Sequence, residues 1–187
     1  MGMWLFVFTE LILFGGMFII YSVYRYAHPA EFHLAATELN TIIGTFNTII
    51  LLTSSLTMAL SITAIQNNNR SLSLLFQFLT ILLGLFFMVN KYFEWMAKIN
   101  HGLFPGSDEL LSKSAGEILF FGLYYVMTGL HGMHVLIGMV LIAVMYRFTS
   151  RGIITHDNYV KLENTGLYWH LVDIIWIFLF PLFYLIT

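Results

Sequence analysis

Five long apolar segments, separated by short polar ones, make up most of this 187-residue chain. Each segment is long enough for the roughly 20 residues that a helix needs to cross a bilayer. Strands of membrane barrels are shorter, and backbone groups in lipid must be hydrogen-bonded internally. The pattern therefore predicts an all-α, polytopic membrane helical bundle with five transmembrane helices, over about residues 3–24, 39–65, 72–95, 118–146 and 167–186.

The polar connections are too short to form further domains. The longest, residues 98–115, contains Pro105-Gly106 and is too small for a separate domain. We therefore expect a single membrane domain over residues 1–187. The first residues, MGMWLFVFTEL, lack a basic region and a small-residue cleavage site, so we interpret them as mature protein rather than as a signal peptide.

Composition supports a membrane protein and excludes several other classes. The chain is 59% hydrophobic and only 10% charged, whereas the surface of a soluble protein must be wetted by polar side chains. The small net charge of −2 argues against nucleic acid as a partner. The chain has no cysteine, which excludes disulfides and thiolate metal sites.

The last apolar segment carries two ionisable residues, His170 and Asp173, within YWHLVDIIWIFLF. They are three residues apart and would share a face of a helix, flanked by Trp169 and Trp176. An ionisable group at membrane depth costs at least a few kcal/mol unless it finds a partner. We therefore expect this pair to contact polar groups of another helix or of a neighbouring chain.

Acidic and basic residues also occur in the first and third segments. For Glu10, alone in WLFVFTELILFGG, we expect a hydrogen bond to a neighbouring helix, with a proton-linked group or an inter-subunit contact as the alternative. Lys91, Glu94 and Lys98 can pair at helical spacing, and we expect a solvated cluster at the membrane interface.

Small and polar residues of the second segment follow a stripe that favours close packing between membrane helices. This stripe consists of Asn40, Gly44, Asn47, Ser54, Ser55 and Met58.

The fourth segment contains TGLHGMHVLIG, in which His131 and His134 share a helix face. The spacing is compatible with metal binding, but a metal site normally needs three or four protein ligands. His170 is the one other histidine expected at that depth, so we favour hydrogen-bonded histidines over a metal site. Our hypothesis is a single buried polar network of Glu10, His131, His134, His170 and Asp173.

Sequence motifs along the chain match those of one known family. YWHLVDIIW (168–176) resembles its YWHxVDxxW motif, TGLHGMHV (128–135) its TGxHGxHV motif, and NTIILLTSS (47–55) its NTxxLLxSS motif. Glu10 in FTELILFGGMF and Glu94 in GLFFMVNKYFEW stand where that family has glutamates. On these motifs the chain resembles subunit III of the haem–copper oxidases, which include cytochrome c oxidases and bo-type quinol oxidases.

The resemblance implies the five-helix form of that subunit, without the first two helices of seven-helix members. Those two helices frame a lipid-holding cleft, which is in doubt here. Lys91 stands where the family has glutamine.

The resemblance also implies a function and partners. Subunit III holds no haem and no copper, so no catalytic, cofactor-binding or metal-binding residues are expected in this chain. Haem and copper are expected in partner subunits. The direct partner would be oxidase subunit I, joined by subunit II, other respiratory subunits and membrane phospholipids. The role would be to support assembly, stability and proton uptake, in a bacterial cytoplasmic membrane. The candidates for a buried polar network or an interface are Glu10, Glu94, His131, His134, Trp169, His170, Asp173 and Trp176.

Other functions remain open on sequence alone. The electron donor could be cytochrome c or a quinol, and the motifs do not separate an oxygen reductase from a nitric oxide reductase partner. Two readings belong to other classes: a small proton-coupled carrier, motivated by Glu10 and the histidines, and a membrane metalloenzyme.

Overall fold

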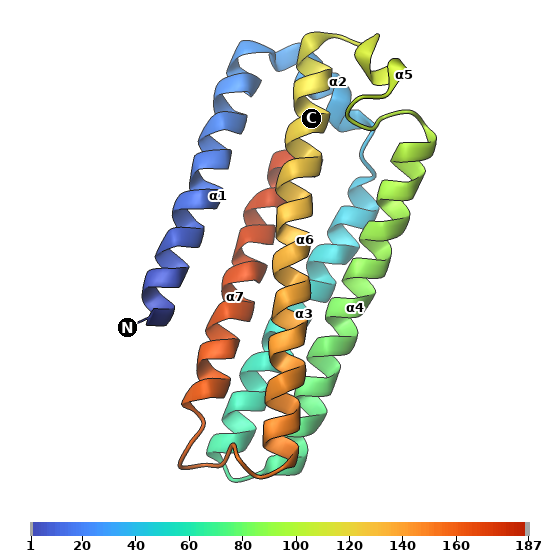
Figure 1. Cartoon of the computed structure of the whole chain (residues 1–187). Coiled ribbons are helices and arrows are strands. Elements are labelled where there is room, and N and C mark those ends of the chain that lie inside the picture. The colour runs from blue at the N-terminus through green and yellow to red at the C-terminus, as the bar shows by residue number, and fades with distance from the viewer. Residues whose placement is uncertain (1, 186–187) are drawn as a thin grey trace.

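The computed structural model describes residues 2–185, and helices account for most of them (Figure 1). Five helices are long and apolar enough to cross a membrane, which confirms the predicted all-α bundle. They are α1 (Gly2–Ala27), α3 (Thr41–Gln66), α4 (Arg70–Asn100), α6 (Ala115–Ser150) and α7 (Val160–Phe180) with its π-helical continuation η1 (Pro181–Leu185). Two short helices lie in the connections, α2 (Pro29–Thr37) and α5 (Asp108–Leu111).

Most spanning helices extend beyond the apolar segments that predicted them. Helix α6 begins at Ala115 because Ser114 and Glu117 form a capping box, in which each side chain binds the other residue's backbone N–H. Helix α7 begins at Val160, seven residues before the predicted start at 167, because its first turns are polar. Apolar patterns mark the length of helix in lipid and miss turns in water. The predicted end at residue 186 lies outside the described residues.

Helices α3, α4, α6 and α7 form the body of the bundle, and α1 lies at its edge against α6 and α7 (Figure 1). Helix α2 packs against α6 and η1 at one end of the bundle. Helix α1 is largely exposed, and Phe14 and Tyr21 are its buried residues. The Tyr21 hydroxyl donates a hydrogen bond to the Leu182 carbonyl of η1, which connects α1 to the C-terminal turn. Among residues 2–185, one broad side of α1 therefore has no neighbour.

The centre of the bundle is built around Trp169 of α7, which is fully buried. An added Cβ at Gly138 of α6 would lie 2.8 Å from the Trp169 ring, and one at Gly84 of α4 would lie 2.9 Å from it. Both glycines are therefore needed for the close approach of the ring. The Trp169 Nε1–H donates to Ser54 Oγ of α3 at 3.0 Å, so this residue contacts three other helices.

Candidate functional site

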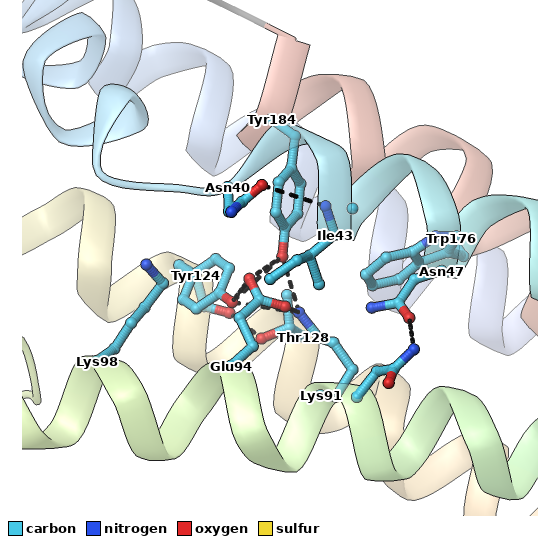
Figure 2. Close-up of polar contacts among 12 residues, drawn as sticks. Asn40, Ile43, Asn47, Lys91, Glu94, Lys98, Tyr124, Thr128, Trp176 and Tyr184 are labelled. Carbon is cyan, nitrogen blue, oxygen red and sulfur yellow. Dashed lines mark hydrogen bonds and ion pairs between the residues drawn. The ribbon is translucent and has the colours of Figure 1, made fainter.

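A buried ion pair lies near one end of α4, between Lys91 and Glu94 (Figure 2). The Lys91 ammonium donates to Glu94 Oε2 at 3.1 Å, to the Tyr184 hydroxyl at 2.9 Å and to the Tyr124 hydroxyl at 3.2 Å. Both tyrosine hydroxyls in turn donate to Glu94 Oε1. All three ammonium donors and both carboxylate oxygens are therefore hydrogen-bonded. We call these four residues the Lys91–Glu94 cluster.

The prediction of a solvated cluster at Lys91, Glu94 and Lys98 was wrong. Lys91 and Glu94 are each 6% exposed, and Lys98 is 7% exposed. Burial is possible because α6 and η1 supply the two tyrosines and the ammonium also faces aromatic rings. Lys91 Nζ lies 5.1 Å from the ring centroid of Trp176, within the range of cation–π attraction.

Tyr124 and Tyr184 were missed by sequence reasoning. They lie 30 and 90 residues from Glu94 along the chain, so no local spacing connects them with it. The available signal was their chemistry: a tyrosine within an apolar segment usually finds a partner for its hydroxyl when buried.

Glu10 and His134 form a second contact, between α1 and α6. Glu10 Oε2 lies 3.0 Å from His134 Nε2, although the two groups are not aligned for a linear hydrogen bond. His134 Nδ1 lies 2.7 Å from the Leu130 carbonyl, which can only accept, so we place a proton on Nδ1. A neutral ring then presents a lone pair at Nε2. The Glu10–His134 contact therefore joins α1 to α6 through two polar groups 3.0 Å apart.

His170 forms a third contact, between α7 and α3. Its Nδ1 lies 2.6 Å from Ser55 Oγ. Asp173 is buried, and within residues 2–185 neither carboxylate oxygen has a hydrogen-bond partner. The Ser55 hydroxyl is close to Asp173, but its hydrogen-bond geometry is met only with His170. His170 and Asp173 therefore differ in environment although they lie one helical turn apart.

His131 is fully buried, and neither ring nitrogen has a hydrogen-bond partner among the described residues. Its ring packs at a centroid distance of 5.2 Å from Trp176 and meets Phe87 edge to face at 5.7 Å. Trp176 itself donates from Nε1 to Thr48 Oγ1 at 3.0 Å. His131 thus occupies an aromatic environment and is not hydrogen-bonded within the described chain.

The hypothesised single network is not what the described residues form. Glu10 pairs with His134, and His170 pairs with Ser55, whereas His131 and Asp173 have no hydrogen-bond partner within residues 2–185. The sequence correctly predicted that these residues lie on helices, but in the structure they do not all face one another. The fourth and fifth spans, α6 and α7, do pack directly on each other, as the hypothesis of a shared network required.

The described residues also bear on cofactors. Within residues 2–185, no three histidine, aspartate or glutamate side chains converge where a metal ion could bind. The polar groups instead join helices: α4 to α6 and η1, α1 to α6, and α3 to α7. This arrangement can hold the helices in register.

Comparison with known proteins gives one consistent family. A family model described as Cytochrome c oxidase subunit III matches residues 1–187. Cytochrome c oxidase subunit 3 of Synechocystis sp. is 33% identical over 186 residues, covering 99% of this chain and 74% of the relative. Cytochrome bo(3) ubiquinol oxidase subunit 3 of Buchnera aphidicola is 30% identical over 187 residues, covering 99% of this chain and 90% of the relative.

A third relative is much longer than this chain. Heme-copper oxidase subunit I+III of Aeropyrum pernix is 30% identical over 194 residues, which cover 99% of this chain and 22% of the relative. The match along the whole chain, the motifs of the fourth and fifth spans and the five spanning helices agree with one another. This integral membrane protein, whose residues 2–185 contain five helices able to cross a membrane, belongs to the cytochrome c oxidase subunit III family.

Proposed function

We propose that this chain is the non-catalytic subunit III of a bacterial cytochrome c oxidase, which reduces oxygen and translocates protons. The observation that carries the proposal is the family match over residues 1–187. In this proposal the haem and copper centres lie in partner subunits. The absence of a converging ligand set within residues 2–185 is compatible with that division of labour.

Subunit I is the proposed direct partner, with subunit II in the same complex. The name of the Aeropyrum relative combines subunits I and III, which supports a direct contact between the corresponding chains here. Helix α1 supplies a suitable surface, because Trp4, Phe8 and Ile12 are exposed along it. An exposed apolar face on a spanning helix suits either lipid or another membrane helix.

We assign two roles to the buried polar groups. The Lys91–Glu94 cluster fixes the relative positions of α4, α6 and η1, and so keeps the subunit in one shape. The Glu10–His134 pair lies next to the exposed side of α1, and its side chains are 13% and 12% exposed. We infer that this pair supports proton uptake at the subunit boundary.

A quinol is the second candidate for the electron donor, because the Buchnera relative is named a ubiquinol oxidase subunit. The features that this chain shares with its subunit III relatives do not depend on whether the electron donor is cytochrome c or a quinol. In both cases the proposed location is the cytoplasmic membrane of a bacterium.

The test is to compare the complex with and without this chain. Affinity purification through a tag on this chain should recover a haem-containing complex that consumes oxygen with reduced cytochrome c. A complex lacking the chain should start at a similar rate but lose activity sooner during turnover and take up protons more slowly. A purified chain that itself carries haem or copper would contradict the proposal. Oxygen consumption with a quinol and not with cytochrome c would favour the second candidate.

A further inference from the structure

A groove of about 630 Å³ runs between α3 and α4, at the end of the bundle that holds the Lys91–Glu94 cluster. Its apolar lining includes Ile43, Phe46 and Phe93, which are exposed to the surroundings. Its polar lining includes Glu38 and Lys98. We call it the α3–α4 groove.

Lys98 is a buried polar side chain of this groove, and among residues 2–185 its ammonium has one acceptor. It is 7% exposed, and its ammonium donates to the Glu38 carbonyl at 2.9 Å. Within residues 2–185 it takes part in no ion pair, although the charges of Glu94 and Glu38 act on it. An ammonium has three donors, and a buried charge is costly unless it is paired and hydrogen-bonded. An anionic oxygen entering the groove would supply the missing partner.

Lys91, on the same helix, differs from Lys98 in the number of its hydrogen-bond partners. All three donors of Lys91 are bonded to protein atoms, whereas the described residues supply Lys98 with one acceptor. In Figure 2 the Lys98 ammonium lies apart from the Lys91–Glu94 cluster. The cluster is complete without a ligand, and Lys98 is not.

The positions of Lys98 and Glu38 along the groove favour one class of ligand. Buried Lys98 lies beside the apolar lining, and the Glu38 side chain is exposed. In a phospholipid the phosphate is close to the acyl chains, and the amine of an ethanolamine headgroup lies further towards water. A primary ammonium donates hydrogen bonds to a carboxylate, whereas a choline group has no N–H to donate.

We propose that the α3–α4 groove binds an ethanolamine phospholipid. Its phosphate accepts hydrogen bonds from Lys98, its ammonium contacts the Glu38 carboxylate, and one acyl chain lies over Ile43, Phe46 and Phe93. The neutral pair of Lys98 and Glu38 then meets a neutral zwitterionic headgroup, which leaves neither charge of the lipid unpaired. This site goes beyond the proposed oxidase role, since it depends on neither the electron donor nor the metal centres.

The experiment measures lipid retained by the intact complex, purified through this chain, delipidated, and incubated with phosphatidylethanolamine, phosphatidylglycerol or phosphatidylcholine. Native mass spectrometry should show phosphatidylethanolamine retained most strongly. Lys98→Gln should lower its retention roughly tenfold or more, since hydrogen bonds to charged groups are the strong ones. Lys98→Arg keeps the charge and should preserve retention. Lys161→Gln, at an exposed lysine of α7, is the matched control.

Glu38→Gln tests the headgroup separately, and because Glu38 is exposed this variant is expected to assemble. It should remove the preference for phosphatidylethanolamine over phosphatidylglycerol while phospholipid is still retained. Asp157→Asn, at a fully exposed carboxylate, should leave the preference intact. Three results would overturn the proposal: no lipid retained by the unaltered complex, retention unchanged in Lys98→Gln, or a lipid preference unchanged in Glu38→Gln. Displacement of the lipid by millimolar inorganic phosphate would also overturn it, because it would indicate a site for free anions.

Discussion

Tyr184 donates a hydrogen bond to Glu94, which connects the last described turn of the chain to α4 near one end of the bundle. The same hydroxyl accepts from Lys91 at 2.9 Å. Gly44 of α3 makes room for this arrangement, because an added Cβ there would lie 2.7 Å from the Tyr184 ring. The C-terminal turn is therefore a structural part of the Lys91–Glu94 cluster.

Tyr184→Phe is expected to destabilise the subunit by about 1–3 kcal/mol, because a buried carboxylate and a buried ammonium each lose a partner. Loss of helical circular dichroism on heating in detergent would measure it. Tyr26→Phe is the control, since Tyr26 is 90% exposed and should tolerate the same change. Equal melting temperatures for the two variants would contradict the assigned role.

Lys91→Met should cost about 3–5 kcal/mol, because it leaves Glu94 buried without its counterion. The double variant Lys91→Met with Glu94→Gln should recover much of that loss, since no uncompensated charge remains. A double-mutant cycle of unfolding free energies measures the coupling. Additive effects of the two substitutions would show that the pair is not coupled.

Gly138→Ala is expected to destabilise by about 1–3 kcal/mol, because the added methyl group meets the Trp169 ring and the core cannot absorb it without strain. Gly122→Ala lies on the same helix with nothing within 4 Å of the added Cβ. It should be neutral or stabilising, by up to about 1 kcal/mol, because alanine is the better helix former. Thermal melts of the two variants provide the comparison. A Gly138→Ala variant as stable as Gly122→Ala would contradict the expected clash between the added methyl group and the Trp169 ring.

His131→Phe should cost little stability, because the described residues offer its ring nitrogens no hydrogen bond to lose. His134→Phe should cost more, since it removes the contacts to Glu10 and to the Leu130 carbonyl. Assembly yield and melting temperature of the purified complex would rank the two. The reverse order would mean that His131 is bonded to a group outside this chain.

Glu10→Gln should keep α1 docked, because a carboxamide N–H can still donate to His134 Nε2. Glu10→Ala should loosen α1, which has few other buried side chains. Hydrogen exchange of the α1 backbone amides reports the difference. Similar protection in both variants would show that the Glu10–His134 pair does not hold α1 in place.

The sequence predicted the number, order and approximate limits of the spans because lipid exposure imposes a continuous apolar run on each of them. It also predicted that Lys91 and Glu94 could pair, since three-residue spacing is a local property of a helix. It could not predict their burial. That depends on Tyr124 and Tyr184, whose positions are set by how α6 and η1 pack against α4.

The partners of the candidate residues of α7 could likewise not be predicted from the sequence. Spacing alone placed His170 and Asp173 on a common face, but a helix face is broad. His170 lies at its edge, half-buried against Ser55, whereas Asp173 points into the interior. Which polar group meets which partner is decided by the rotation of each helix about its own axis, and no local pattern encodes that rotation.

The location of Lys91 and Glu94 on one helix also bears on how this protein enters the membrane. Because the two charges lie one turn apart on α4, this span carries its own counterion. The Lys91–Glu94 pair can leave the insertion machinery electrically neutral before α6 and η1 have been synthesised. A pair divided between two helices would expose each charge to lipid until its partner arrived, at a cost of several kcal/mol. The tyrosines can then close over an ion pair that already exists, so the order of synthesis along the chain matches the order of assembly.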